Sequence, residues 1–133
     1  MTPTVFAEPD ALLRAAPLDL GGTAWVEIGA GEVSSFEAGT GGAVSGYYAL
    51  SLTNRFLPEL LQVPGASSGI NYGAETVRFG APLRAGDRVR GAARLVAASE
   101  VGGGVQTAIE ITVEVAGTDR PACVVRSLSR WLR

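Results

Sequence analysis

One apolar segment restricts the fold of this chain more than any other feature of its sequence. Residues 45–61 form a helical pattern that is apolar on most sides, with Tyr48 and Phe56 on one face. Such a helix is stable only when it is buried. Ser45 is a suitable N-cap, and Pro58 is expected to kink the helix or end its regular part. The rest of the chain must therefore supply a surface that covers this helix.

Alternating apolar and polar residues after this helix predict antiparallel strands. The expected strands are residues 72–79, 88–98, 106–115 and 121–131. In the second of them, the face toward the core is expected to carry Val89, Ala93, Leu95 and Ala97. A sheet with one apolar face must cover that face, and the central helix is the element available for this. The sequence therefore predicts an α+β protein, a curved antiparallel sheet wrapped around one central helix.

The signals before the central helix are weaker. Residues 1–24 include three prolines and are expected to be irregular, apart from a helical turn over 11–16. A short strand is expected over 25–28, and a helix over 31–38 that stops at Gly39. The length of 133 residues predicts a single domain, 1–133, with an irregular N-terminal segment.

The composition excludes several kinds of chemistry and partner. The chain has no histidine, its 11 basic residues are all arginine, and its single cysteine is Cys123. Histidine-dependent triads, a lysine Schiff base, a zinc site and an intrachain disulfide are therefore excluded. We expect no metal and no cofactor. The net charge of -2 does not favour nucleic acid. The absence of an apolar run of membrane-spanning length and of signal-peptide features favours a cytoplasmic protein.

Short stretches along the chain resemble one known family. They are Trp-Val-Glu-Ile at 25–28, Val-Ser-Ser-Phe at 33–36, Gly-Thr-Gly at 39–41, Ser-Gly-Tyr-Tyr at 45–48, Ile-Asn-Tyr-Gly at 70–73, Val-Arg-Phe at 77–79 and Pro-Leu-Arg-Ala-Gly-Asp at 82–87. In this order they resemble the MaoC-like hotdog proteins, and most closely the branch of nodulation protein N-like dehydratases. The resemblance implies a hotdog fold. It also implies hydration of enoyl thioesters, or dehydration of 3-hydroxyacyl thioesters, on coenzyme A or acyl carrier protein.

The resemblance also implies a catalytic pair that this chain lacks. In the family a loop runs Thr-Gly-Asp, then Asn-Pro, then a hydrophobic residue and His, and the Asp and His activate the reacting water. Here Thr40 and Gly41 are followed by Gly42, and residues 42–46 lead directly into the central helix. We therefore expect the overhanging loop to be deleted together with both catalytic residues.

The thioester-binding part of the family site can survive this loss. The resemblance places the thioester carbonyl at the N-terminus of the central helix, where free backbone N–H groups stabilise negative charge. The expected substrate-binding residues are Ser45, Gly46, Asn54 and Asn71. The candidate acid or base groups are Glu37, Tyr47, Tyr48 and Tyr72. For each there is a structural alternative: a helix cap, a solvated carboxylate, core or interface packing.

Two functions of different classes follow from these expectations. The first is an enzyme acting on an acyl-thioester or polyketide-like substrate, in a lyase, dehydratase or cyclase type of step without the Asp/His pair. The second is a non-catalytic acyl-binding subunit of a heteromeric hotdog hydratase. Because an open sheet leaves its edge strands unpaired, we expect a homodimer.

Overall fold

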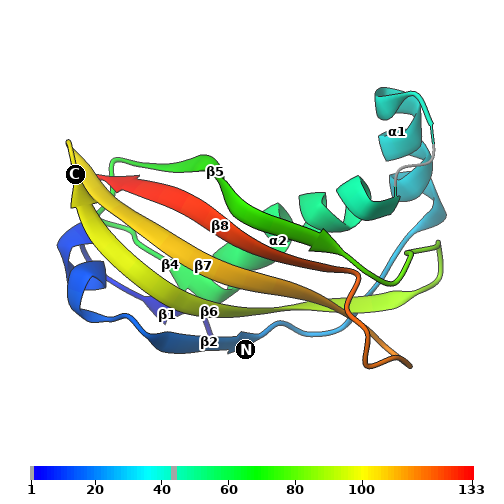
Figure 1. Ribbon diagram of the computed structural model, residues 1–133, viewed down its shortest axis with the longest axis horizontal. Helices are drawn as coiled ribbons and strands as arrows, with labels where there is room; N and C mark the ends of the chain where they lie inside the picture. Colours follow the sequence, from blue (N-terminus) through cyan, green and yellow to red (C-terminus); the bar gives the residue numbers. More distant parts are fainter. Residues whose placement is uncertain (1, 43–44) are drawn as a thin grey trace.

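The computed structural model describes residues 2–42 and 45–133, and it has the predicted hotdog arrangement (Figure 1). The described residues form a six-stranded antiparallel sheet with the strand order β2-β6-β7-β8-β5, and β3 also pairs with β6. The strands are β2 (Leu18–Gly22), β3 (Val26–Glu27), β5 (Ser68–Phe79), β6 (Arg88–Val101), β7 (Gly104–Val115) and β8 (Cys123–Leu132). The other elements are β1 (Thr4–Val5), η1 (Pro9–Arg14), α1 (Ala30–Thr40), α2 (Ser45–Leu60) and β4 (Leu61–Gln62).

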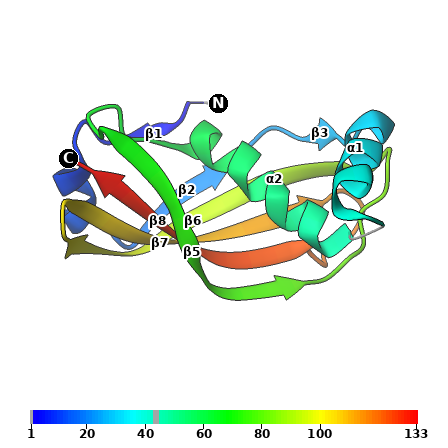
Figure 2. The ribbon, with the colours of Figure 1, turned by 90° about the horizontal axis from the view of Figure 1, so that it is seen from above.

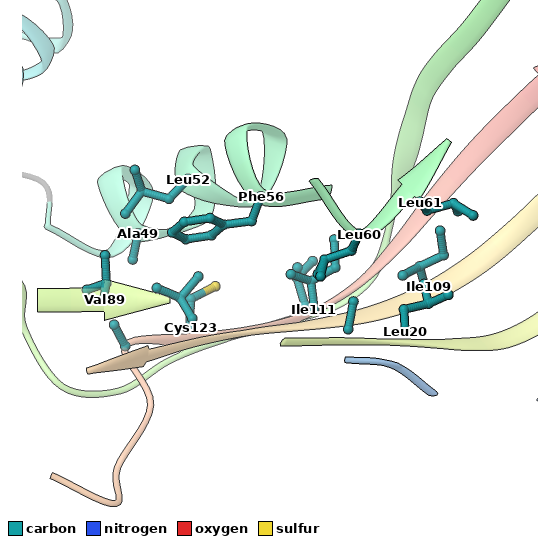
Figure 3. Close-up of a cluster of buried hydrophobic side chains, with 14 of the residues drawn as sticks. Leu20, Ala49, Leu52, Phe56, Leu60, Leu61, Val89, Ile109, Ile111 and Cys123 are labelled. Atoms are coloured by element: carbon teal, nitrogen blue, oxygen red, sulfur yellow. The ribbon is translucent and has the colours of Figure 1, made fainter. Parts of the chain in front are cut away.

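The predicted central helix, α2, lies across one face of the sheet, with β5 along one side of it (Figure 2). Its buried residues recur at the helical spacing; they are Tyr48, Ala49, Leu52, Phe56 and Leu60. Of these, Ala49, Phe56 and Leu60 point toward the sheet (Figure 3). Alternate residues of the strands meet them from below, among them Val89, Ile109, Ile111, Val113 and Cys123. These contacts between helix and sheet form the centre of the hydrophobic core, as the period-two and helical patterns predict, and η1 adds Leu12 to it.

The N-terminal part is more regular than expected. Residues 1–24 were expected to be irregular, but β2 pairs with β6 and extends the sheet, while β1 pairs in parallel with β4. The short length of these strands and the register shift between Asp19 and Gly21 leave no clear alternation in the sequence. Pairing with a long neighbouring strand, which is a tertiary effect, makes them extended.

Three local expectations also need correction. Ala97 is exposed, because a register shift between Leu95 and Ala97 interrupts the alternation of β6. The first helix continues past Gly39 to Thr40, and its C-cap is Gly41, whose φ of 82° is left-handed and favours glycine. Ser45 is the first residue of α2 rather than the residue that precedes it. Residues 43 and 44, where we expect the shortened loop, lie outside the described residues.

Strand β5 is the feature that positions the candidate site. It pairs with β8 on one side, and all of its residues are exposed. Two register shifts, between Asn71 and Gly73 and between Ala74 and Thr76, each insert one extra residue into β5. These bulges place the extra residues, Tyr72 and Glu75, on the convex face beside arginines of β8.

Candidate functional site

A groove runs between α2 and β5, and its floor is formed by the concave face of β7 and β8. It consists of two adjoining cavities of about 230 and 360 Å³. Their combined size is in the range of small-molecule sites, roughly 300–1,000 Å³. A third cavity of about 310 Å³ continues the groove past the end of α2, around Leu61 and Pro64.

Two of the predicted substrate-binding residues meet in this groove. Asn54 comes from α2 and Asn71 from β5, and both line both cavities. Asn54 and Asn71 are exposed, as expected for residues on the rim of an open groove. The inward face of β8 adds Ser127 and Ser129, which were not among the predicted site residues. The sequence does contain a signal for these two residues. They occupy inward positions of an alternating strand, where apolar residues are usual.

The far end of the groove is rigid. Trp131 lines it and donates a hydrogen bond from Nε1 to Oγ1 of buried Thr107, at 2.9 Å. A Cβ added at Gly69 would lie 3.3 Å from the same ring, so β5 passes the tryptophan closely. These contacts hold the indole in one orientation, and its ring forms an apolar wall of the groove.

Tyr72 lies on the face of β5 that points away from the groove, because neighbouring residues of a strand face opposite sides of the sheet. The Tyr72 ring lies on the convex face, 3.7 Å from the guanidinium carbon of Arg130. Asn71, one residue earlier, pairs with Ser129 and faces inward. Two residues that were predicted together from one short motif therefore lie on opposite faces of the sheet.

The first turn of α2 has an aromatic border. The rings of Tyr47 and Phe79 meet edge to face at 5.5 Å, and both side chains are about half exposed. A Cβ at Gly46 would lie 2.9 Å from two carbons of the Phe79 ring. The glycine therefore lets the end of β5 approach the helix terminus, next to the exposed side chain of Ser45.

Tyr48 is buried on the other side of α2, toward α1. Its ring meets that of Phe36 edge to face at 5.3 Å, and its hydroxyl has no hydrogen-bond partner among the described residues. Burial raises the pKa of the phenol, and the charge of Glu32 raises this pKa further, while Arg55 lowers it. Tyr48 is not among the residues that line the groove.

The structure brings a different glutamate to Tyr48 than the one predicted as a base. Glu32 lies beside Tyr48 and forms a long ion pair with Arg55, at 3.8 Å. Glu37, the predicted base, lies further along α1 and is partly buried. Its main-chain carbonyl accepts a hydrogen bond from the N–H of Gly42, just after the end of α1. Neither glutamate lines the groove. Glu32 gave no signal in the sequence, because only the packing of α1 on α2 places it there.

The described residues contain no cluster of three or more side chains suited to hold a metal ion. In the same part of the chain, no helix is long and apolar enough to cross a membrane. The candidate site is therefore an open groove with an apolar floor and a few polar side chains, near the first turn of a buried helix.

Comparison with known proteins relates this architecture to one class, the MaoC-like hotdog dehydratases. A MaoC-like dehydratase from Rhodospirillum rubrum matches with a TM-score of 0.64 and 17% identity, over 85% of this chain and 90% of that chain. A structure described as a monoamine oxidase regulatory protein from Archaeoglobus fulgius matches with a TM-score of 0.65 and 11% identity, over 100% of this chain and 99% of that chain. These likenesses show the fold.

Sequence relatives define the family. The 3-hydroxyacyl-thioester dehydratase Z of Mycobacterium tuberculosis (strain ATCC 25618 / H37Rv) is 34% identical over 141 residues, which cover 91% of this chain and 93% of the relative. Nodulation protein N of Rhizobium leguminosarum bv. viciae is 33% identical over 94 residues, which cover 68% of this chain and 58% of the relative. No family model matches the sequence. The chain belongs to the MaoC-like dehydratase family.

The alignment with the mycobacterial dehydratase is longer than this chain, with 141 positions against 133 residues, although it uses only 91% of the chain. Some positions of the relative therefore have no counterpart here.

Proposed function

We propose that this protein binds an acyl thioester, carried on coenzyme A or acyl carrier protein, with the acyl chain in the groove between α2 and β5. The observation that carries this proposal is the meeting of Asn54 and Asn71 over a floor that includes the apolar side chains of Ile111 and Trp131. The groove reaches Leu50, about one turn from the start of α2. A thioester carbonyl at the first turn of α2 would therefore direct its acyl chain into the groove.

The proposed reaction is a lyase-type step, a dehydration or a cyclisation, without the Asp/His pair of the family. Support comes from the family membership, from the absence of histidine in the sequence, and from the surplus length of the dehydratase in the alignment. The reacting carbonyl would accept hydrogen bonds from the amides of Gly46 and Tyr47. Any remaining acid or base would come from Glu37, Tyr47 or Tyr48, because Tyr72 lies on the opposite face of the sheet. A polyketide-like substrate, disposed to react once it is held in one conformation, suits such a site.

A second candidate function is a non-catalytic acyl-binding subunit of a heteromeric hydratase. A specific observation favours it: none of the described residues that line the two cavities is titratable. Proton transfer needs a positioned acid and base, so the groove by itself can bind and orient an acyl chain but cannot move protons. In this case a partner chain with the complete pair would perform the chemistry.

We also propose that the protein is a homodimer in which β5 pairs with β5 of a second copy. The unpaired edge of β5 carries four large apolar side chains that are exposed by 38–54%, Ile70, Tyr72, Val77 and Phe79. Long exposed edges of this kind pair with other chains unless they are protected. A cytoplasmic location is proposed from the single, buried, unpaired cysteine, Cys123.

The decisive experiment incubates the purified protein with a panel of enoyl and 3-hydroxyacyl thioesters and follows water loss or gain, and ring closure, by mass spectrometry. Turnover by the protein alone would support the enzyme. Turnover only in the presence of a complete MaoC-like partner, together with co-purification of the two chains, would support the subunit. If no thioester binds or reacts in either arrangement, the proposed function is wrong.

A further inference from the structure

The chain contains two asparagines, Asn54 and Asn71, and the fold brings both to one point of the groove. Among the described residues, those shared by the two adjoining cavities are Thr53, Asn54, Asn71 and Ser127. All four are polar. We call this set the polar waist of the groove.

Apolar side chains line the groove on both sides of the polar waist. On the side of the α2 N-terminus they include Leu50, Ala74 and Val125. On the other side they include Leu57, Ile111 and Trp131. The groove is thus mainly apolar on both sides of the polar waist, with one hydroxyl group on each side, that of Ser51 and that of Ser129. An acyl chain that fills the groove meets most of its hydrogen-bonding groups, and both of its amides, in the middle.

The polar waist has hydrogen-bonding capacity that the fold does not use. The hydroxyl of Thr53 donates to the carbonyl oxygen of Leu50 at 2.7 Å, which leaves its lone pairs free to accept. The hydrogen bonds between described residues do not use the side-chain amides of Asn54 and Asn71 or the hydroxyl of Ser127. In the open groove, water can satisfy these groups. A plain alkyl chain would displace this water and leave them without partners, at a cost of about 1–3 kcal/mol for each group that becomes buried.

We propose that the groove selects a long acyl chain that carries a hydroxyl group at an internal position, where the amides of Asn54 and Asn71 bind it. This inference rests on the proposed function and specifies its substrate class. A hydroxyl group both donates and accepts, as the two amides do. Its carbon neighbours on both sides would lie against the apolar parts of the groove.

The helix gives the position of this hydroxyl group. From Gly46, where the thioester carbonyl would bind, to Asn54 the helix rises by about 12 Å. An extended chain advances by about 1.2 Å per bond. The hydroxyl group would therefore lie about ten bonds from the thioester carbonyl. A shorter acyl chain would not reach the polar waist.

The test measures binding of N-acetylcysteamine thioesters of one long saturated acid and of a series in which a single hydroxyl group is moved along the same chain. Quenching of tryptophan fluorescence gives the readout, because Trp131 lines the groove. We expect the isomer with the hydroxyl group about ten bonds from the carbonyl to bind roughly tenfold more tightly than the saturated chain, which corresponds to one or two hydrogen bonds. Asn54→Leu and Ser127→Ala should reduce this preference.

Thr76→Val is the control, because Thr76 is a polar residue of the same strand as Asn71 but pairs with Arg126 and lies away from the groove. It should leave the preference unchanged. Equal binding of the saturated chain and all hydroxylated isomers would overturn the inference while thioester binding stands. Failure of every thioester to bind would overturn the proposed function and this inference together.

Discussion

The ring of Phe79, at the end of β5, packs so closely on Gly46 that a Cβ there would lie 2.9 Å from two ring carbons. This contact joins the exposed edge strand to the first turn of the buried helix. It brings the two elements that border the groove together at one end. At this position, glycine is required by the approach of the ring and not by the backbone conformation, since Gly46 is helical.

Gly46→Ala should therefore destabilise the protein, by about 1 kcal/mol, because Phe79 must move. In a Phe79→Ala background the same substitution should stabilise it, because alanine favours a helix more than glycine does. Chemical denaturation of the four proteins of this double-mutant cycle gives the free energies of unfolding. Equal effects of Gly46→Ala in both backgrounds would show that the ring does not restrict this position.

Gly91→Ala should destabilise the core. Gly91 is a buried residue of β6, and a Cβ there would lie 2.5–2.7 Å from Cβ, Cγ and Cδ2 of fully buried Phe56. Overpacking of this kind costs about 1–3 kcal/mol. Gly73→Ala is the control, since a Cβ at Gly73 meets nothing within 4 Å, and its effect on the free energy of unfolding should stay within about 0.5 kcal/mol.

Tyr48→Phe should retain or increase stability at neutral pH, because it removes a buried hydroxyl group without a described partner. Burial raises the pKa of Tyr48 above its ordinary value of 10.0. Ionisation therefore favours the unfolded chain. The contribution of the neutral Tyr48 phenol to the free energy of unfolding is complete below about pH 10. It is lost as the pH rises through the pKa that Tyr48 has in the folded protein.

The wild-type protein should accordingly lose stability at alkaline pH more steeply than Tyr48→Phe, as measured by urea unfolding at a series of pH values. Burial also raises the pKa of Cys123, so Cys123→Ala gives the separate contribution of the thiol. Identical pH profiles of wild type and Tyr48→Phe would contradict the burial of an unpartnered phenol.

Charges on the edge of β5 should prevent the proposed dimer. Ile70 and Val77 are exposed on this strand, and lysine at such positions disfavours edge-to-edge pairing. Light scattering should give twice the chain mass of 13.7 kDa for the wild type and 13.7 kDa for the Ile70→Lys, Val77→Lys double variant. A wild-type protein that is monomeric at micromolar concentration would refute the dimer.

The purified protein should be a poor catalyst of crotonyl-CoA hydration. Water addition needs one group to deprotonate water and another to protonate the alpha carbon, and such acid–base catalysis contributes about 100- to 10,000-fold. The chain has no histidine for this. Hydration as fast as that of a MaoC-like enzyme with the complete pair would overturn this expectation. A rate loss in Glu37→Gln would then identify the replacement base.

Local periodicity accounts for what could be predicted from the sequence. The buried series of α2 repeats every three or four residues, and that of β7 every two, so the faces of Leu52 and Ile111 follow from the backbone geometry of each element. A helix with one apolar face and strands with one apolar face have few ways to cover each other. The hotdog arrangement follows from this without knowledge of any particular contact.

Only the tertiary structure decided which predicted site residues meet. Asn54 and Asn71 lie together because α2 crosses the sheet beside β5, and this lateral position has no periodic signal. The opposite orientation of Tyr72, by contrast, follows from the alternation of neighbouring strand residues, which is already present in the sequence. The sequence by itself determined which faces are buried, since burial follows from local periodicity. The tertiary structure determined the site, since proximity across the groove depends on the packing of whole elements.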